Sequence, residues 1–292
     1  MKVSATPQAI VIRDLESFED LRKVKAVEKE VWGLQEDDSI PMTMAVACRA
    51  AGCILVGAFD GNEMAGFAFA IFGREHGQIT IHSHMLAVRD RYRQHDLGWK
   101  LKLAQRERAL AMGIREMTWT YDPLQSRNAH LNFSKLGVIS DTYKIDFYGP
   151  ETSSVLHQNG TDRLWVRWLL DSRRVADRVA GKSARAETLD ALRHIAPLVS
   201  FNGDGRPARA DSAETLARQR VNIEIPGEIL DVEGSDMQLA REWRAATRWA
   251  FAESIKAGFY VSEFCRSIRG QQGPGAYLLE QGRVDNPAAL DR

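Results

Sequence analysis

The chain has 292 residues, 44% of them hydrophobic, which is enough to build one large domain with an appendage or two domains. Lysine plus arginine and aspartate plus glutamate each number 39, so the zero formal charge gives no argument for a nucleic-acid or membrane partner. The three cysteines lack metal-ligand spacing and indicate a reduced protein without disulfides. No apolar targeting core or membrane-length run occurs, so we expect a cytoplasmic protein.

The first part of the chain predicts a strand, two helices and a hairpin. Apolar residues recur at helical spacing after Ser17, which is a good N-cap, and a second helix is expected after Pro41. Two apolar runs around the turn Asp60-Gly61-Asn62 indicate the hairpin. The predicted elements are strand 10–13, helices 17–31 and 43–51, and hairpin strands 53–59 and 64–72.

A long apolar strand over residues 79–88 is followed by a predicted helix from Leu97 to Met112. Gly113 has the character of the residue that ends such a helix. We expect this helix to pack on the sheet through an apolar stripe that Arg108 interrupts; its members are Leu101, Ala104, Ala111 and Met112.

The later part of the chain changes character at residue 171. Strands are expected over 116–121, 139–148 and 164–170, with a helix over 128–136. Residues 171–219, rich in alanine, arginine and small polar residues, are predicted to form a linker with surface helices. A β-α-β extension should follow over 220–292, after a first domain over 8–170. Its helix, over 236–257, is expected to begin with a capping box formed by Ser235 and Gln238.

The junction between strand 79–88 and the following helix is a candidate anion site. The first turn of a helix has N–H groups without intrahelical partners, and the helix dipole is positive there. A phosphate can therefore bind at such a corner through backbone amides. Arg93 would add a positive charge, and Gly98 would permit close approach of a ligand.

Two sequence blocks resemble a known family. Leu86-Ala87-Val88, followed by Arg93-x-x-Asp96-x-Gly98, resembles motif A of the GNAT acyltransferases, whose loop pattern is Arg/Gln-x-x-Gly-x-Gly/Ala. Downstream, Asn128 and the run from Phe133 to Val138 resemble the family's Asn…Tyr-x-x-x-Gly-Phe ending. The two blocks occur in the family's order, separated by one helix and one strand, and the resemblance covers roughly residues 8–150.

The resemblance implies an α/β (α+β) protein with the GNAT fold, in which helices flank a central mixed twisted sheet, here with the C-terminal β-α-β extension. It also implies acetyl-CoA or another acyl-CoA as co-substrate, without a metal. The pantetheine would pair with the end of strand 79–88, and the diphosphate would bind over residues 93–98. The residues implied in cofactor binding are Leu86, Ala87, Val88, Arg93, Gln94, His95, Asp96, Leu97, Gly98, Trp99, Asn128 and Phe133.

This chain departs from the family pattern at two positions. Asp96 replaces the first glycine of the loop, and a carboxylate about 4 Å from a phosphate charge would cost on the order of 4 kcal/mol at an effective dielectric near 20. We therefore expect Asp96 to face solvent, since aspartate tolerates unusual backbone angles. Phe133 replaces a tyrosine that in many family members protonates the departing thiolate. The thiolate would then take its proton from water.

Two residues are candidates for the acid–base chemistry of acyl transfer. His82 and His84 point to one face of their strand by period two, and His84 lies closest to the expected thioester. His84 is a candidate base acting through water, and equally a histidine hydrogen-bonded within the sheet. Asp122, at the end of the next strand, is a candidate base, an ammonium ligand, or a cap for the turn at Pro123. Arg241, Arg244 and Arg248 form either a solvated helix face or a site for a substrate carboxylate.

The expected function is N-acyl transfer from acyl-CoA to the primary amine of a small molecule, directly in a ternary complex. The resemblance extends to a subgroup sometimes linked with N-acylated amino acids, which makes a succinyl donor and an amino-acid acceptor a specific variant. A catalytically weak acyl-CoA-binding or regulatory protein is the alternative, favoured by Asp96 and Phe133. We expect no nucleic-acid or membrane partner, and a homodimer stays open.

Overall fold

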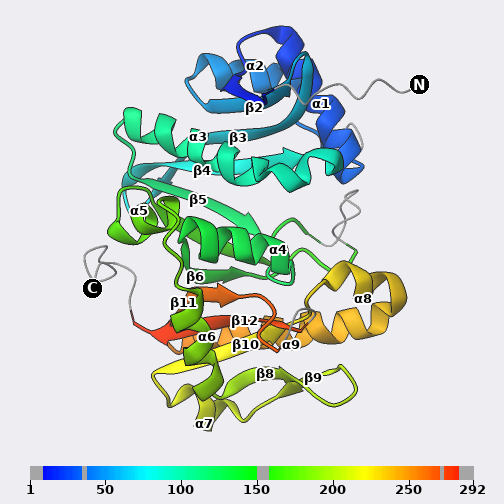
Figure 1. Ribbon diagram of the computed structural model, residues 1–292, viewed down its shortest axis with the longest axis vertical. Coiled ribbons are helices and arrows are strands. Elements are labelled where there is room, and N and C mark those ends of the chain that lie inside the picture. Colours follow the sequence, from blue (N-terminus) through cyan, green and yellow to red (C-terminus); the bar gives the residue numbers. More distant parts are fainter. Residues whose placement is uncertain (1–8, 35–37, 150–157, 270–272, 283–292) are drawn as a thin grey trace. The chain divides into compact units, whose positions relative to one another are not determined.

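The computed structural model describes residues 9–34, 38–149, 158–269 and 273–282 (Figure 1). The chain divides into two compact units. Unit 1 comprises residues 1–119 and 152–158, and unit 2 comprises residues 120–151 and 159–292. The strand over residues 116–121 runs through the boundary between them.

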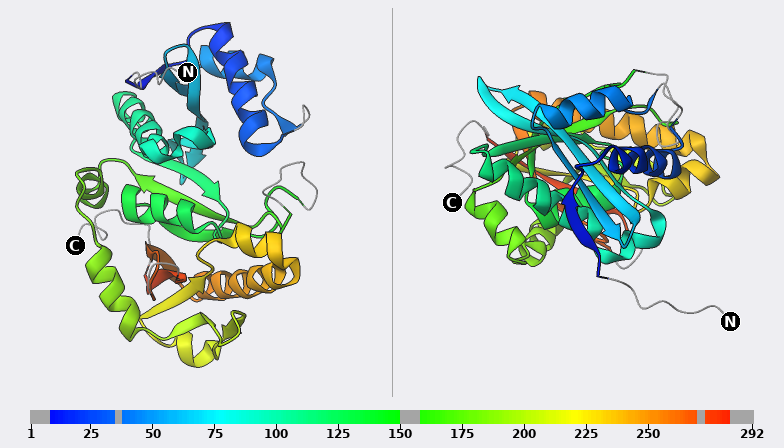
Figure 2. Two further views of the ribbon diagram at one scale, coloured as in Figure 1. Left: turned by 45° about the vertical axis from the view of Figure 1, so that its right-hand side comes forward. Right: turned by 90° about the horizontal axis from the view of Figure 1, so that it is seen from above.

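Unit 1 contains a mixed sheet in the order β1-β2-β3-β4-β5. Strands β1 to β4 pair antiparallel, and β4 pairs parallel with β5. The long pair β3 and β4 forms the centre of this sheet (Figure 2). The strands are β1 (Val11–Asp14), β2 (Ile54–Asp60), β3 (Glu63–Glu75), β4 (Gln78–Val88) and β5 (Glu116–Tyr121).

Helices cover both faces of the unit 1 sheet (Figure 2). Helices α1 (Phe18–Trp32) and α2 (Met42–Ala50) share an apolar core with β2, β3 and β4, where Trp32 packs edge-on against Phe67. Helix α3 (Leu97–Ala111) packs against β2, β3 and β4. The short 3-10 helix η2 (Asp90–His95) joins β4 to α3. The start of α3 therefore follows the end of β4 with only this short helix between them.

Unit 2 contains strands in the order β7-β6-β11-β12-β10-β8-β9. β10 and β8 pair parallel, whereas β7 with β6, β6 with β11, β11 with β12, β12 with β10, and β8 with β9 pair antiparallel. The strands are β6 (Ile139–Lys144), β7 (Arg163–Leu169), β8 (Pro197–Phe201), β9 (Pro207–Arg209), β10 (Arg220–Ile225), β11 (Phe259–Cys265) and β12 (Gly275–Gln281).

The long helix α9 (Met237–Lys256) is the main helix of unit 2, and it packs along β6, β11, β10, β8 and β9. A single helix was predicted over 128–136. The structure has a one-turn α-helix there that continues as a π-helix, and Gly137 ends this π-helix with φ +75°. The remaining helical segments are α4 (Ser126–Ala129), η3 (His130–Leu136), α5 (Arg173–Val179), α6 (Arg185–His194), α7 (Ser212–Leu216) and α8 (Ile229–Ser235).

The mixed α/β class expected from the sequence is confirmed, and most element types match their predicted segments. The segment 171–219, expected as a linker with surface helices, also contains β8 and β9, and β8 pairs with β10. The predicted capping box of α9 is wrong. Asp236 caps this helix by accepting the Leu239 N–H, because Ser235 ends the preceding helix α8 and donates its hydroxyl to the Asp231 carbonyl.

The described residues contain neither a membrane-spanning helix nor a cluster of metal ligands. No helix in these ranges is long and apolar enough to cross a membrane. Within the same ranges, no group of three or more histidine, cysteine, aspartate or glutamate side chains is arranged to hold a metal ion.

Candidate acyl-CoA site

The end of β4 carries the three residues to which the resemblance assigns the pantetheine. Leu86, Ala87 and Val88 pair on one side with β3, opposite Ala68, Phe67 and Gly66. On the other side, the register of β4 with β5 comprises Ile81 with Met117 and His82 with Thr118. β4 continues beyond these positions to Val88, so its final residues extend past the paired part of the two parallel strands.

The turn into α3 adopts the backbone that the family pattern gives to glycine. Asp96 has φ +53° and ψ +25°, in the left-handed region that L residues rarely occupy. Its side chain is exposed and makes no capping hydrogen bond to the helix. The first N–H groups of α3 are therefore not capped by the Asp96 carboxylate, and the exposed side chain agrees with the expectation that Asp96 faces solvent.

Replacing Asp96 with glycine should change CoA affinity by less than tenfold. The carboxylate is exposed, where the interaction of two charges about 4 Å apart is only ~1 kcal/mol in bulk water. Glycine also adopts the left-handed backbone without the steric cost paid by aspartate. Calorimetric titration of wild type and Asp96→Gly with CoA measures the effect, and a gain above tenfold would mean that the carboxylate opposes the diphosphate.

The other residues of this loop differ in their exposure to solvent and in their partners. Arg93 is about half exposed and forms an ion pair of 2.7 Å with Asp90, one turn earlier. His95 is exposed, and its ring lies 6.5 Å from that of Tyr92. Leu97 is fully buried, while Gly98 and Trp99 are half-buried. The side chain of Gln94 lies outside the described part of the structure.

The two histidines of β4 have different surroundings. His82 Nδ1 lies 3.0 Å from the Thr118 hydroxyl, and burial together with the charges of His84 and Lys102 lowers the pKa of His82 to about 4. The side chain of His84 is exposed, and its ring packs edge-on against Phe69. Desolvation by the surrounding atoms lowers the pKa of His84 below its ordinary value. His82 and His84 were predicted to share one face of their strand because side chains alternate along a regular strand. The pairing of β3 with β4 shifts register between Phe69 and Ile71, and this shift interrupts the alternation.

A polar cluster that the sequence reasoning missed lies between α3 and β4. The predicted apolar stripe of α3 is partly wrong, because Met112 is exposed whereas Lys102 and Gln105 are buried. Lys102 Nζ donates to the Ser83 hydroxyl at 2.8 Å. The Ser83 hydroxyl in turn donates to Gln105 Oε1 at 2.8 Å. Lys102 is the neighbour of Leu101 on α3 and lies only about 100° further round the helix. Its position beside this buried leucine could have revealed that Lys102 faces the sheet.

Asp122 lies in unit 2 and belongs to a buried ion pair. Its two oxygens accept from the Arg244 guanidinium at 2.9 and 2.7 Å, and Oδ1 also accepts the Leu124 N–H at 2.9 Å. Burial by itself would lower the pKa of the Arg244 guanidinium. The charge and hydrogen bonds of Asp122 act more strongly in the other direction, so the pKa of Arg244 is raised. This geometry gives Asp122 the turn-capping role and does not favour the role of base.

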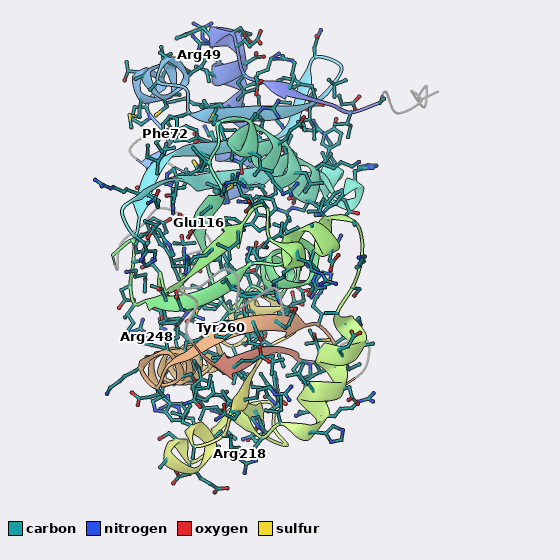
Figure 3. The ribbon with its side chains drawn as sticks, turned by 90° about the vertical axis from the view of Figure 1, so that its left-hand side faces the viewer. Arg49, Phe72, Glu116, Arg218, Arg248 and Tyr260 are labelled. Carbon is teal, nitrogen blue, oxygen red and sulfur yellow. The ribbon has the colours of Figure 1, made fainter. Side chains whose placement is uncertain are left out.

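The arginine stripe predicted on α9 therefore does not form one solvated face. Arg244 is buried, whereas Arg248, labelled in Figure 3, is partly exposed. Arg248 donates to Asp162 through Nε at 2.8 Å and through its terminal nitrogen at 2.7 Å. Asp162 is fully buried and also accepts the Tyr143 hydroxyl at 2.6 Å. Asp162 thus forms an internal ion pair with Arg248.

The residues of the second sequence block also lie in unit 2. Asn128 is exposed on α4. Phe133 is fully buried, and its ring packs edge-on against Tyr277 with centroids 5.8 Å apart. The Tyr277 hydroxyl donates to the Pro123 carbonyl at 2.6 Å. Burial raises the pKa of Tyr277 well above its ordinary value, so the neighbouring tyrosine is a core residue and no evident replacement for the missing acid.

Comparison with known proteins gives matches only among solved structures. No family model matches the chain. No curated protein matches it. A putative GNAT-family acetyltransferase from Desulfovibrio desulfuricans is 16% identical, with 56% of this chain and 99% of that chain covered and a TM-score of 0.44. The ribosomal-protein-S18-alanine N-acetyltransferase from Escherichia coli is also 16% identical, covering 55% and 94%, with a TM-score of 0.44.

A third structure is a putative acetyltransferase from Salmonella typhimurium with its cofactor acetyl-CoA, 15% identical over 57% of this chain and 96% of that chain, with a TM-score of 0.45. Over part of its length, this chain is similar to acetyltransferases. The likeness is distant in sequence and leaves much of the chain uncovered.

Proposed function

We propose that this protein is a GNAT-type N-acyltransferase that uses acyl-CoA as co-substrate. The observation that carries the proposal is the turn from β4 into α3, where Asp96 takes the left-handed backbone at the family's glycine position and leaves the first turn of α3 uncapped by its side chain. Backbone N–H groups and the helix dipole then favour a diphosphate at this corner. Arg93, close to the turn and about half exposed, supplies a positive charge.

The acyl group is acetyl or another short acyl group, including succinyl, and the acceptor is the primary amine of a small molecule such as an amino acid. Transfer is direct: the amine attacks the thioester carbonyl, the C–S bond breaks, and CoA leaves as a thiol. Leu86–Val88 would pair with the pantetheine amides, as the sequence resemblance implies. The proposal includes Asn128 and Phe133 as cofactor-binding residues, because the sequence resemblance implies that role for both. Phe133 has no hydroxyl, so water supplies the proton for the thiolate.

His84 is the proposed base for the acceptor amine, acting through water. A neutral imidazole is needed, and the lowered pKa of His84 keeps it neutral at physiological pH. We expect His84→Gln to reduce kcat by ~10²-fold or more, the usual contribution of a general base, with little change in CoA affinity. The rate of wild type should fall only below the ordinary histidine pKa of about 6.5, because protonation then removes the base. An unchanged kcat in His84→Gln would assign this histidine to the sheet alone.

The test of the function is thiol release from acetyl-CoA and succinyl-CoA against amino acids, amino sugars, polyamines and aminoglycosides, with CoA binding measured in parallel. We expect release with one class of acceptor, and Arg93→Gln should weaken CoA binding by ~3–10-fold through loss of one charged contact. The control Arg22→Gln changes an exposed arginine on α1 and should leave binding unchanged. Saturable binding without release would favour the regulatory alternative, and no binding would refute the CoA assignment.

A further inference from the structure

Two of the three cysteines lie together at the end of α2, which Arg49 marks in Figure 3. Cys53 directly precedes β2, and its N–H donates to the Cys48 carbonyl at 2.9 Å. The Gly52 N–H donates to the Arg49 carbonyl at 3.1 Å, and Gly52 takes φ +83°, in the left-handed region. These two hydrogen bonds around a left-handed glycine form a Schellman motif, which ends the helix.

The Schellman motif determines where the two thiols lie. In this motif, the third-last residue of the helix and the second residue beyond its cap bring their side chains into contact. Cys48 and Cys53 occupy these two positions. Both cysteines pack in the apolar core that α1 and α2 share with the sheet. Burial, and then the adjacent Cys53 thiol, raise the pKa of Cys48, so the two sulfur atoms are neighbours.

The backbone separation of the two cysteines suits a disulfide. A disulfide joins residues whose Cα atoms lie about 4.4–6.8 Å apart. Residues that are hydrogen-bonded to each other across a sheet have Cα atoms about 5.5 Å apart, which is within this range. The direct hydrogen bond from Cys53 to Cys48 gives the pair a comparable separation. The two sulfur atoms can therefore be joined without pulling α2 away from β2.

The two thiols differ in their access to solvent. Cys48 is buried, whereas Cys53 is partly exposed. A buried thiol reacts slowly, because burial disfavours the thiolate that is the nucleophile. An oxidant in solvent therefore reaches Cys53 first and finds Cys48 as the adjacent second thiol. The third cysteine, Cys265, is buried and belongs to unit 2.

We propose that Cys53 and Cys48 form a reversible oxidation site whose oxidant is a hydroperoxide. The Cys53 sulfur attacks the terminal peroxide oxygen and the O–O bond breaks. The oxygen that leaves takes the Cys53 proton, and Cys53 becomes a sulfenic acid. The Cys48 sulfur then attacks the Cys53 sulfur, the S–O bond breaks, and hydroxide leaves with the Cys48 proton as water. Two thiols thus give two electrons to the peroxide and become one disulfide, which a dithiol reverses.

The adjacent thiol protects Cys53 from irreversible damage. A sulfenic acid without a neighbouring thiol is oxidised further to sulfinic and sulfonic acids, which ordinary thiols do not reduce. Cys48 competes with that reaction because its sulfur lies beside Cys53 before the oxidant arrives. The disulfide also ties the end of α2 covalently to the residue before β2. This oxidation is independent of the proposed acyl transfer.

The experiment treats the folded 292-residue chain with hydrogen peroxide, alkylates the remaining thiols and maps tryptic peptides without reductant. Trypsin cuts after Arg49, between the two cysteines, so their disulfide joins two peptides that are otherwise separate. We expect the cross-link between Cys48 and Cys53, reversed by dithiothreitol, with Cys265 still reduced. Three unreacted thiols, sulfinic acid at Cys53 without a cross-link, or a cross-link to Cys265 would each overturn the proposal.

Three variants assign the roles of the cysteines. Cys48→Ala should lose the cross-link and accumulate sulfinic acid at Cys53, whereas Cys53→Ala should lose the cross-link and keep Cys48 reduced. Cys265→Ala is the matched control at a buried cysteine and should keep the cross-link. Reduced Cys53 in peroxide-treated Cys48→Ala would contradict its role as the first thiol. Circular dichroism before treatment checks that each variant is folded, and the wild-type cross-link remains the test if Cys48→Ala does not fold.

Discussion

Arg244→Met should lower the free energy of unfolding by about 3–5 kcal/mol, the usual effect of removing one partner of a buried ion pair. The Arg244 and Asp122 side chains are almost fully buried and are joined by two hydrogen bonds of 2.7 and 2.9 Å. Arg244 Nε also donates to the Asn159 carbonyl at 2.8 Å. The variant leaves the buried Asp122 carboxylate without its guanidinium partner and the Asn159 carbonyl without the Arg244 donor. Urea denaturation at neutral pH measures the change.

Two further variants test whether the loss comes from the unpaired charge. Arg241→Met removes an exposed arginine from the same helix and should change stability by less than about 0.5 kcal/mol. The double variant Asp122→Asn with Arg244→Met removes both charges and should recover part of the loss, which a double-mutant cycle reports as coupling. A loss below 1 kcal/mol in Arg244→Met would contradict the buried pair.

Glu28→Gln should stabilise the protein above neutral pH but not at pH 5. Glu28 lies on α1 among core residues, it is fully buried, and neither carboxylate oxygen has a hydrogen bond of normal geometry in the described structure. Burial raises the pKa of Glu28 to about 7, although the Ile40 backbone and the charge of Lys25 act in the opposite direction. The folded state therefore holds a proton that the unfolded state releases near pH 4.5.

The direction of the pH effect follows from this difference in bound protons. Between pH 4.5 and 7 the native state binds more protons than the unfolded state, so wild-type stability falls as pH rises and then levels off. A shift from 4.5 to about 7 corresponds to a loss of about 3 kcal/mol. Urea denaturation at pH 5 and pH 8 should show this gap between wild type and Glu28→Gln only at pH 8. The control Glu19→Gln, at an exposed site on α1, should show no such change.

Local signals in the sequence were sufficient for most of the elements. The Ser17 cap of α1 is confirmed with its capping box, in which the Asp20 side chain completes the reciprocal bond. Gly113 follows the end of its helix with positive φ, as predicted. These features depend on residues within one turn of each other, and such short-range interactions can be read from spacing alone.

Features that depend on distant partners could not be predicted in the same way. Ser235 and Asp236 are both good caps, and the presence of the preceding helix α8 decides between them. Asp122 was open to three roles until Arg244, 122 residues later in the chain, was found as its partner. The strand character of segment 171–219 is set by pairing with β10, because its composition resembles that of a surface linker.

The sequence by itself determined the mixed α/β class, the order of the elements up to β7 and the location of the candidate phosphate-binding turn, since all of these follow from local periodicity and from two short motifs. Only the tertiary structure decided which polar residues are buried and with what partner. Lys102 lies beside Leu101 on α3, and periodicity places both near the sheet, but contact with Ser83 and Trp119 is what makes it a buried ammonium. Burial and pairing of a charge depend on atoms that come together only when distant segments pack.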